Sequence, residues 1–155
     1  MTTLVLTPLP APLPSLDPLP PGARAVVADA APGYPCRRCL RDAAPGETVI
    51  LLSYDPFLGE SPYRQPGPIY VHRETCAPAS PAPADELPEH LPEQLTRRLL
   101  SVRAFDEDHL MRTAVVTPGV ELARVAGELL DAPDTAYLHV HNAGPGCFAV
   151  RIDRA

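Results

Sequence analysis

The sequence contains no tryptophan and no lysine. Aromatic residues make up only 5% of the chain, so a binding surface built on stacked indole rings is excluded. Because all 13 basic residues are arginine, Schiff-base chemistry and a phosphate-binding loop of the Walker type both lack their lysine. The net charge of −6 argues against partners that are nucleic acids or anionic membranes, since phosphate groups demand a basic surface.

Long apolar segments are also missing. No apolar run approaches the ~20 residues that a helix needs to cross a bilayer. The first twenty residues carry no positive charge, and their repeated prolines would break the apolar helix of a secretory signal. We therefore expect a cytoplasmic protein, in which the four cysteines are thiols, metal ligands or redox groups rather than disulfides.

The chain has 155 residues, which suits one domain. We predict a proline-rich N-terminal arm over residues 1–22 and a single globular domain over residues 23–155. The arm is expected to be extended and packed on the domain as a surface segment. The alternative is a polyproline ligand for another protein, because such segments are already ordered for that use.

Short runs of apolar and β-branched residues predict strands along the whole chain. They are residues 2–6, 23–29, 48–54, 69–73, 100–105, 111–116, 136–142 and 147–153. A helical turn is expected within residues 35–42 and a short helix within residues 93–100. No regular alternation of strands and helices occurs, so the predicted class is α+β, with one mainly antiparallel sheet of about five to seven strands.

One amphipathic helix is clear, at about residues 118–130. Thr117 is placed to cap it and Pro118 to occupy its first position. Its apolar stripe consists of Leu122, Val125, Ala126, Leu129 and Leu130.

The last two strands flank a Gly-Pro-Gly turn and predict a C-terminal β-hairpin. Because successive side chains of a strand point to opposite faces, we predict that one face of this hairpin meets the core. That face consists of Leu138, Val140, Phe148, Val150 and Ile152, which leaves Tyr137, His139 and His141 on the opposite face.

Several stretches occur together in an order typical of one bacterial family. They are Pro35-Cys36-Arg37, DAAPGE at residues 42–47, Ser61-Pro62-Tyr63-Arg64, LSVRAFD at 100–106 and HVHNAGPGC at 139–147. In these motifs the chain resembles the uncharacterised bacterial proteins of domain-of-unknown-function family 1203. The resemblance implies a stand-alone domain of this length and carries over no activity.

Two pairs of metal-binding residues predict a zinc site. Cys36 and Cys39 form a CxxC pair, and His72 and Cys76 form an HxxxC pair. Zinc prefers four tetrahedral sulfur and nitrogen ligands, which proteins usually supply as two close pairs. Such a closed site would be structural. The plain alternative is a set of small buried thiols beside a half-exposed histidine.

The same CxxC pair allows a redox function. Arg37, Arg38 and Arg41 surround Cys36 and Cys39, and nearby arginines lower the pKa of a thiol. A pair of this kind cycles between dithiol and disulfide. The strand–turn–helix opening of thioredoxin-like proteins is absent, however.

A second candidate metal site lies on the predicted hairpin. His139 and His141 lie two residues apart on one strand and so point the same way. With Cys147, or with His109, Asp106 or Asp108, as a third ligand, an open site of this kind would support metal-assisted hydrolysis. The alternative is a solvent-facing strand edge whose histidines bind no metal.

The hypothesis that we favour is a small non-enzymatic domain that acts by binding or interaction and contains a zinc site at Cys36, Cys39, His72 and Cys76. The competing hypotheses are a thiol redox protein and a metal-dependent hydrolase, so the question of enzymatic activity stays open. The sequence identifies no partner, and it leaves a homo-oligomer open.

Overall fold

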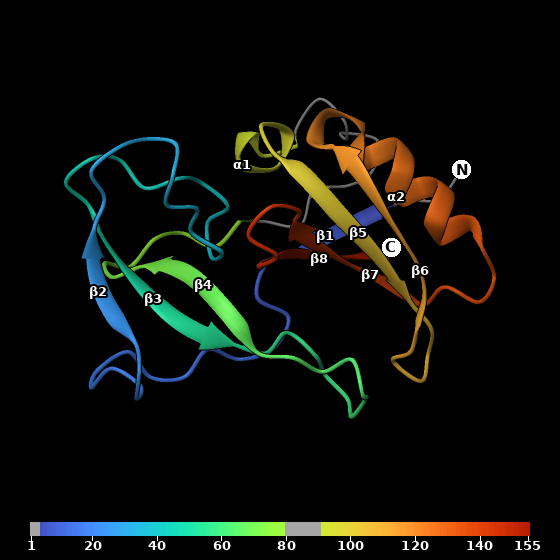
Figure 1. Cartoon of the computed structure of the whole chain (residues 1–155), viewed down its shortest axis with the longest axis horizontal. Coiled ribbons are helices and arrows are strands. Elements are labelled where there is room, and N and C mark those ends of the chain that lie inside the picture. The colour runs from blue at the N-terminus through green and yellow to red at the C-terminus, as the bar shows by residue number, and fades with distance from the viewer. Residues whose placement is uncertain (1–3, 80–90) are drawn as a thin grey trace.

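The chain folds into two antiparallel sheets, seen side by side in Figure 1. The computed structural model describes residues 4–79 and 91–155. The larger sheet has the order β1-β8-β7-β5-β6, with bounds Leu4–Thr7, Phe148–Arg154, Tyr137–Asn142, Leu99–Phe105 and Met111–Pro118. The smaller sheet has the order β2-β3-β4, with bounds Arg24–Val27, Thr48–Tyr54 and Gly67–His72.

The α+β class and the C-terminal hairpin, β7–β8, are confirmed. The expectation of one sheet of five to seven strands is wrong, because the eight strands divide between two sheets. The division follows from a pairing between opposite ends of the chain: β1 pairs with β8. Residues 24–72 are thereby left to form their own meander, β2–β3–β4.

The larger core lies between the five-stranded sheet and helix α2 (Leu122–Asp131), which covers one face of that sheet (Figure 1). Leu138 and Val140 of β7 are fully buried in it, as the alternation predicts. The short helix α1 (Glu93–Thr96) adds Leu95, which is also fully buried. Residues of both helices therefore pack into the core on one face of the larger sheet.

The start of the long helix differs from the prediction. Strand β6 continues to Pro118, and a single 3₁₀ turn, η2 (Gly119–Glu121), precedes α2. Thr117 does not cap the helix, because its hydroxyl donates to the carbonyl of Pro118. The cause is the pairing of Pro118 with Leu99 in the sheet, which holds this residue in extended conformation.

The smaller core lies on the three-stranded sheet and consists mainly of Ile50, Leu52, Ile69 and Val71. Apolar residues of the proline-rich segment 9–19 pack against this core. Tyr54 fixes that segment, because its hydroxyl accepts a hydrogen bond from the backbone N–H of Ala11 at 2.8 Å. The segment therefore covers its own chain, while the proposed boundary at residue 22 stays a prediction.

A β-bulge in the hairpin changes one predicted face. Val140 pairs with Val150, but the next residue, His141, pairs with Phe148. Two residues of β8 thus oppose one of β7, which turns Phe148 away from the helix-covered core. The prediction that Phe148 shares a face with Val150 and Ile152 is therefore wrong, and Phe148 packs in the smaller core instead.

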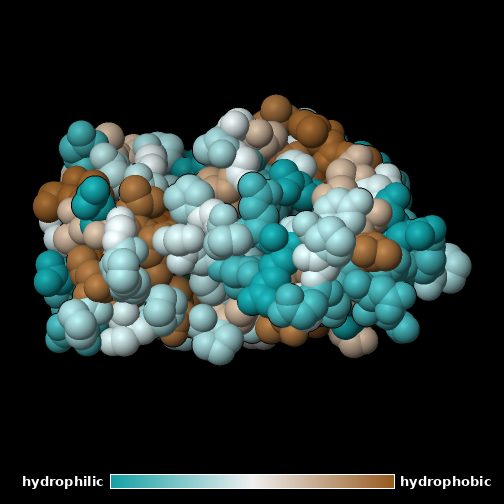
Figure 2. Space-filling model, turned by 60° about the horizontal axis from the view of Figure 1, so that its bottom comes forward, coloured by the Kyte–Doolittle hydropathy of each residue, from teal (hydrophilic) through white to brown (hydrophobic). Residues whose placement is uncertain are grey.

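On the face drawn in Figure 2, hydrophobic residues lie in separated patches and hydrophilic residues cover much of the area between them. Large exposed hydrophobic side chains include Val27 on β2 and Val116 on β6. Within the two described ranges, no helix has both the length and the apolar content that crossing a membrane requires.

Candidate metal centre

The CxxC pair lies in a tight turn between β2 and β3. Cys36 bridges to Tyr70 of β4, and the N–H of Arg37 donates to the Tyr70 carbonyl at 2.9 Å. The N–H of Leu40 donates to the Cys36 carbonyl, which closes a single turn. Leu40 has a φ of 57°, so the chain reverses directly after Cys39 instead of continuing as a helix. A left-handed residue other than glycine costs about 1–2 kcal/mol, so surrounding contacts must hold this turn.

The second pair comes from the end of strand β4. His72 is the last residue of β4, and Cys76 follows in the next segment. The N–H of Ala79 donates to the Arg38 carbonyl at 2.9 Å and so joins this segment to the CxxC turn. The backbone N–H of His72 donates to Cys36 Sγ at 3.3 Å. Residues separated by the whole of β3 and β4 thus converge at one point.

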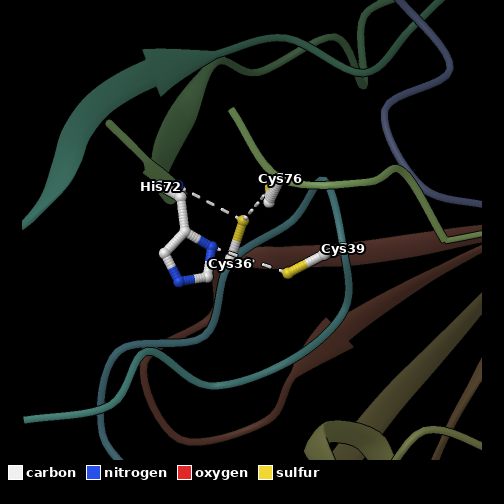
Figure 3. A group of neighbouring side chains, drawn as sticks. All are labelled: Cys36, Cys39, His72 and Cys76. Carbon is white, nitrogen blue, oxygen red and sulfur yellow. Dashed lines mark hydrogen bonds between the residues drawn. The ribbon is translucent and has the colours of Figure 1, made fainter. Parts of the chain in front are cut away.

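The four side chains point toward one another (Figure 3). Their donor atoms all lie within 4.8 Å of one another. The sulfurs of Cys36 and Cys76 are 3.8 Å apart, and Cys39 Sγ lies 3.6 Å from His72 Nδ1. A zinc tetrahedron with ordinary bond lengths has edges of about 3.8 Å between sulfurs and about 3.6 Å between sulfur and nitrogen. These two separations therefore already have the dimensions of a zinc site.

The cluster is largely shielded from solvent. Cys36 is 0% exposed, Cys39 and His72 are each 7% exposed, and Cys76 is half-buried. A hydrogen bond from the Cys39 thiol lowers the pKa of Cys36 to about 7, against the opposing effect of burial. The same hydrogen bond, together with burial, raises the pKa of Cys39 to about 12. Above about pH 7 and without a metal, the two sulfurs therefore hold one proton between them, and a bound cation would displace it.

Groups around the cluster fix its turn. The buried side chain of Gln94, on α1, donates to the Cys36 carbonyl at 3.1 Å. Arg98 forms a two-point ion pair with Asp42, with distances of 2.8 and 3.3 Å, and also donates to the Gln94 carbonyl. The turn is therefore attached to the five-stranded half of the molecule as well as to β4.

The other nitrogen of His72 faces a carboxylate. His72 Nε2 lies 3.2 Å from Glu47 Oε2, but the N–H direction does not complete a hydrogen bond, and the nitrogen has no hydrogen-bond partner among the described residues. Metal-bound histidines usually donate their second N–H to a carboxylate, which fixes the ring. Glu47 is placed for this role, because its exposed side chain needs only to rotate for its carboxylate to accept the N–H of His72.

The residues of the second candidate site are arranged differently. His139 is 0% exposed, and neither of its ring nitrogens has a hydrogen-bond partner in the part of the chain that the structure describes. His141 Nδ1 lies 2.9 Å from the Gly146 carbonyl, and Cys147 Sγ lies 2.9 Å from Arg37. Over residues 4–79 and 91–155, the only group of at least three donors close enough for one metal ion is Cys36, Cys39, His72 and Cys76.

Two of the additional ligands considered for that site, His109 and Asp106, are engaged elsewhere, and Asp108 is exposed. His109 Nδ1 lies 2.8 Å from the Tyr137 hydroxyl. Asp106 accepts hydrogen bonds from the backbone N–H groups of Asp108 and Leu110 and so caps the turn before β6. The structure therefore brings together the ligands of the predicted zinc site, Cys36, Cys39, His72 and Cys76. It does not bring together those of the predicted site on the hairpin.

Burial of His139 predicts a loss of stability in acid. Burial, and the nearby His141, lower its pKa from 6.5 to about 3. Below pH 6.5 the unfolded chain binds a proton at His139 that the folded chain does not bind. The free energy of unfolding is therefore undiminished by this residue above pH 6.5, and it falls as the pH drops from 6.5 toward 3. The loss between pH 6.5 and pH 5 is about 2 kcal/mol.

His139→Leu should remove that dependence while it retains the packing against Phe57, Phe105 and Phe148. Urea unfolding at a series of pH values measures the difference between wild type and variant. The difference should be constant above pH 7 and change by about 2 kcal/mol between pH 6.5 and pH 5. A constant difference down to pH 5 would show that His139 is not held neutral.

Sequence reasoning did not find two residues of the centre. Arg37 was considered only as part of an arginine cluster near the thiols, yet it is 1% exposed and bonded to the hairpin. Glu47 was assigned no specific partner, because its approach to His72 depends on the register between β3 and β4. The spacing of residues along the chain contains no signal for either contact.

Comparison with known proteins identifies a family model that matches residues 33–154, which include the whole metal-ligand cluster and both strands of the hairpin. Its description is "Protein of unknown function (DUF1203)". No curated protein matches the chain, and no solved structure does.

Proposed function

The chain belongs to the DUF1203 family, and we propose that its function rests on a structural zinc ion held by Cys36, Cys39, His72 and Cys76. The ion would join the CxxC turn to the end of β4 and to the segment that follows it. The domain is then a non-enzymatic, zinc-stabilised module that acts by binding. None of its four cysteines forms a disulfide, which agrees with a reducing compartment such as the cytoplasm.

One observation carries the proposal: the convergence of four soft donors with two separations, 3.8 and 3.6 Å, that match a zinc tetrahedron. Three thiolates and one imidazole favour zinc over magnesium or calcium, which prefer oxygen ligands. The donor atoms lie at most 4.8 Å apart, so the longest of their separations must shorten by about 1 Å for all four atoms to bind one zinc ion. Small buried thiols in an ordinary core have no reason to adopt this arrangement.

Four protein ligands leave no open position for water, which favours a structural role over a hydrolytic one. A thiol redox function has weaker support, because Cys36 and Cys39 are both buried and redox thiols need solvent access. Gln94 and Arg98 also hold the CxxC turn in place through their hydrogen bonds to Cys36 and Asp42. A rigid turn of this kind favours a structural role over a catalytic one.

Cobalt(II) substitution tests the proposal directly. The metal-free chain titrated with cobalt should develop thiolate charge-transfer absorption and the intense visible bands of tetrahedral coordination, saturating at one equivalent. His72→Ala should keep the charge-transfer absorption with weaker and shifted visible bands. Weak bands typical of octahedral cobalt, or no saturation, would contradict a closed Cys₃His site.

Glu47→Gln should weaken zinc binding about tenfold, because the amide no longer attracts the second N–H of His72. Glu74→Gln is the matched control, since Glu74 lies on the same surface recess beside Cys76 and makes no ion pair among the described residues. Competition with a chromophoric chelator measures both affinities. Equal affinities of the two variants would show that Glu47 acts only through general charge.

A further inference from the structure

A second groove lies between the two sheets and is separate from the metal centre. Its volume is about 570 Å³. Its walls come from the loop between β3 and β4, from β5 and from the tip of the hairpin. The residues that matter for its chemistry are Arg103, His141, Cys147 and the aromatic side chains Phe57, Tyr63 and Phe105.

The cationic groups beside this groove lack carboxylate partners. Arg37 is 1% exposed and donates to the carbonyls of Phe148 and Pro35 and to Cys147 Sγ, at 2.9 Å from the sulfur. Arg103 donates to the Ser101 hydroxyl at 3.2 Å. In the part of the chain that the structure describes, neither arginine forms an ion pair with a carboxylate. The groove therefore has a positive charge without a carboxylate partner on its wall, at Arg103, and a second one buried behind Cys147, at Arg37.

A buried guanidinium requires a compensating negative charge or complete hydrogen bonding. Cys147 Sγ is the atom at hydrogen-bond distance from Arg37 that can become anionic. The Asn142 side-chain amide adds a second donor at 3.6 Å from the same sulfur. Both contacts direct N–H donors at this sulfur and so hold it in place at the edge of the groove.

Neighbouring groups leave this sulfur available for chemistry. Cys147 is half-buried and lines the groove. Asn142 is 4% exposed and turns its amide nitrogen toward the sulfur, while its carbonyl oxygen has no hydrogen-bond partner among the described residues. His141 carries its proton on Nδ1, facing the Gly146 carbonyl. Burial lowers the pKa of His141 to about 4, so this residue is neutral and the positive charge comes from the arginines.

We propose that Cys147 is a nucleophile, reacting as every cysteine does through its thiolate form, in an anion-selective groove, and that the groove accepts a small carboxylate with an electrophilic carbon. The carboxylate pairs with Arg103, and the apolar part of the molecule packs against the aromatic wall. The sulfur attacks the electrophilic carbon, a carbon–sulfur bond forms, and the leaving group departs with its bonding electrons. The step requires no oxidant, reductant or metal, and it does not depend on the zinc centre.

Iodoacetate and iodoacetamide test the proposal, because they differ in charge and share the same leaving group, iodide. Rates of alkylation at Cys147 are measured by peptide mass spectrometry on the full, natively folded chain. The same chain unfolded in denaturant supplies the intrinsic ratio of the two rates. Folding should raise the ratio of iodoacetate to iodoacetamide by about tenfold, as expected for attraction by a fixed positive charge.

Arg103→Gln should lower this ratio by about threefold, because the iodoacetate reaction loses its attracting charge and slows more than the iodoacetamide reaction. Arg24→Gln is the control for net charge, since Arg24 is exposed on β2 and does not line the groove. The proposal fails if Cys147 is inert to both reagents, if folding leaves the ratio unchanged, or if the two variants behave alike. Zinc content measured on the same sample distinguishes this result from the proposed function: anion selectivity without zinc supports the reactive Cys147 and contradicts the metal centre.

Discussion

Replacement of Cys36 by serine is expected to lower the free energy of unfolding of the zinc-loaded protein by about 5 kcal/mol or more. A structural zinc ion supplies folding free energy directly, about 10–16 kcal/mol in isolated zinc-finger peptides. Loss of one of the four ligands removes a large part of it, and the site joins the CxxC turn to the end of β4. Most single substitutions cost far less, so the size of the effect is itself diagnostic.

The matched comparison uses the metal-free proteins. Cys36 is fully buried, so serine also has a cost that is independent of metal. Wild type and Cys36→Ser, both stripped by chelator, should differ by about 1 kcal/mol. Chemical denaturation with and without zinc gives the four values. An equal cost in the presence and absence of zinc would mean that Cys36 is only a packed thiol.

Gly119→Ala is expected to destabilise the protein by about 4 kcal/mol, more than overpacking usually costs. An added Cβ would lie 1.8 Å from the Leu95 carbonyl oxygen and 2.8 Å from that of Arg98. Both are backbone atoms of the α1 region and cannot move aside as a side chain does. The N–H of Gly119 also donates to the Arg98 carbonyl at 2.8 Å. The close approach of η2 to α1 thus requires a residue without a side chain.

Gly127→Ala is the control for this substitution. Gly127 lies inside α2, and an added Cβ would have no neighbour within 4 Å. Alanine is favoured over glycine in a helix interior, so this variant should be more stable by about 0.5–1 kcal/mol. Thermal or urea unfolding of both variants measures the contrast. A small effect at Gly119 would show that α1 is not tightly seated against η2.

Local patterns predicted most of the strands but not their arrangement. The run at Thr48–Tyr54 and the hairpin around the Gly-Pro-Gly turn were visible because periodicity and turn residues are local signals. The division into two sheets was not, because it depends on pairing between β1 and β8 at opposite ends of the chain. The bulge opposite His141 likewise left no mark in the alternation and reversed the predicted face of Phe148.

For the candidate metal site, too, the sequence predicts the local pairs of residues but not how they come together. Spacing alone identified two pairs, Cys36–Cys39 and His72–Cys76, because metal ligands usually come as close pairs. That the pairs meet required the bridge between Cys36 and Tyr70, which no local rule contains. The burial of Arg37 against Cys147 was also beyond prediction, since the two residues lie on different elements and meet only through the fold.

The most direct measurement is the metal content of untagged protein purified without chelator, paired with a count of reactive thiols under native conditions. We expect one zinc per chain, with Cys36, Cys39 and Cys76 protected from thiol reagents until a chelator is added. Cys76→Ser should lose most of that zinc. A metal-free protein with all four thiols reactive, or with Cys36 and Cys39 readily oxidised to a disulfide, would contradict the account.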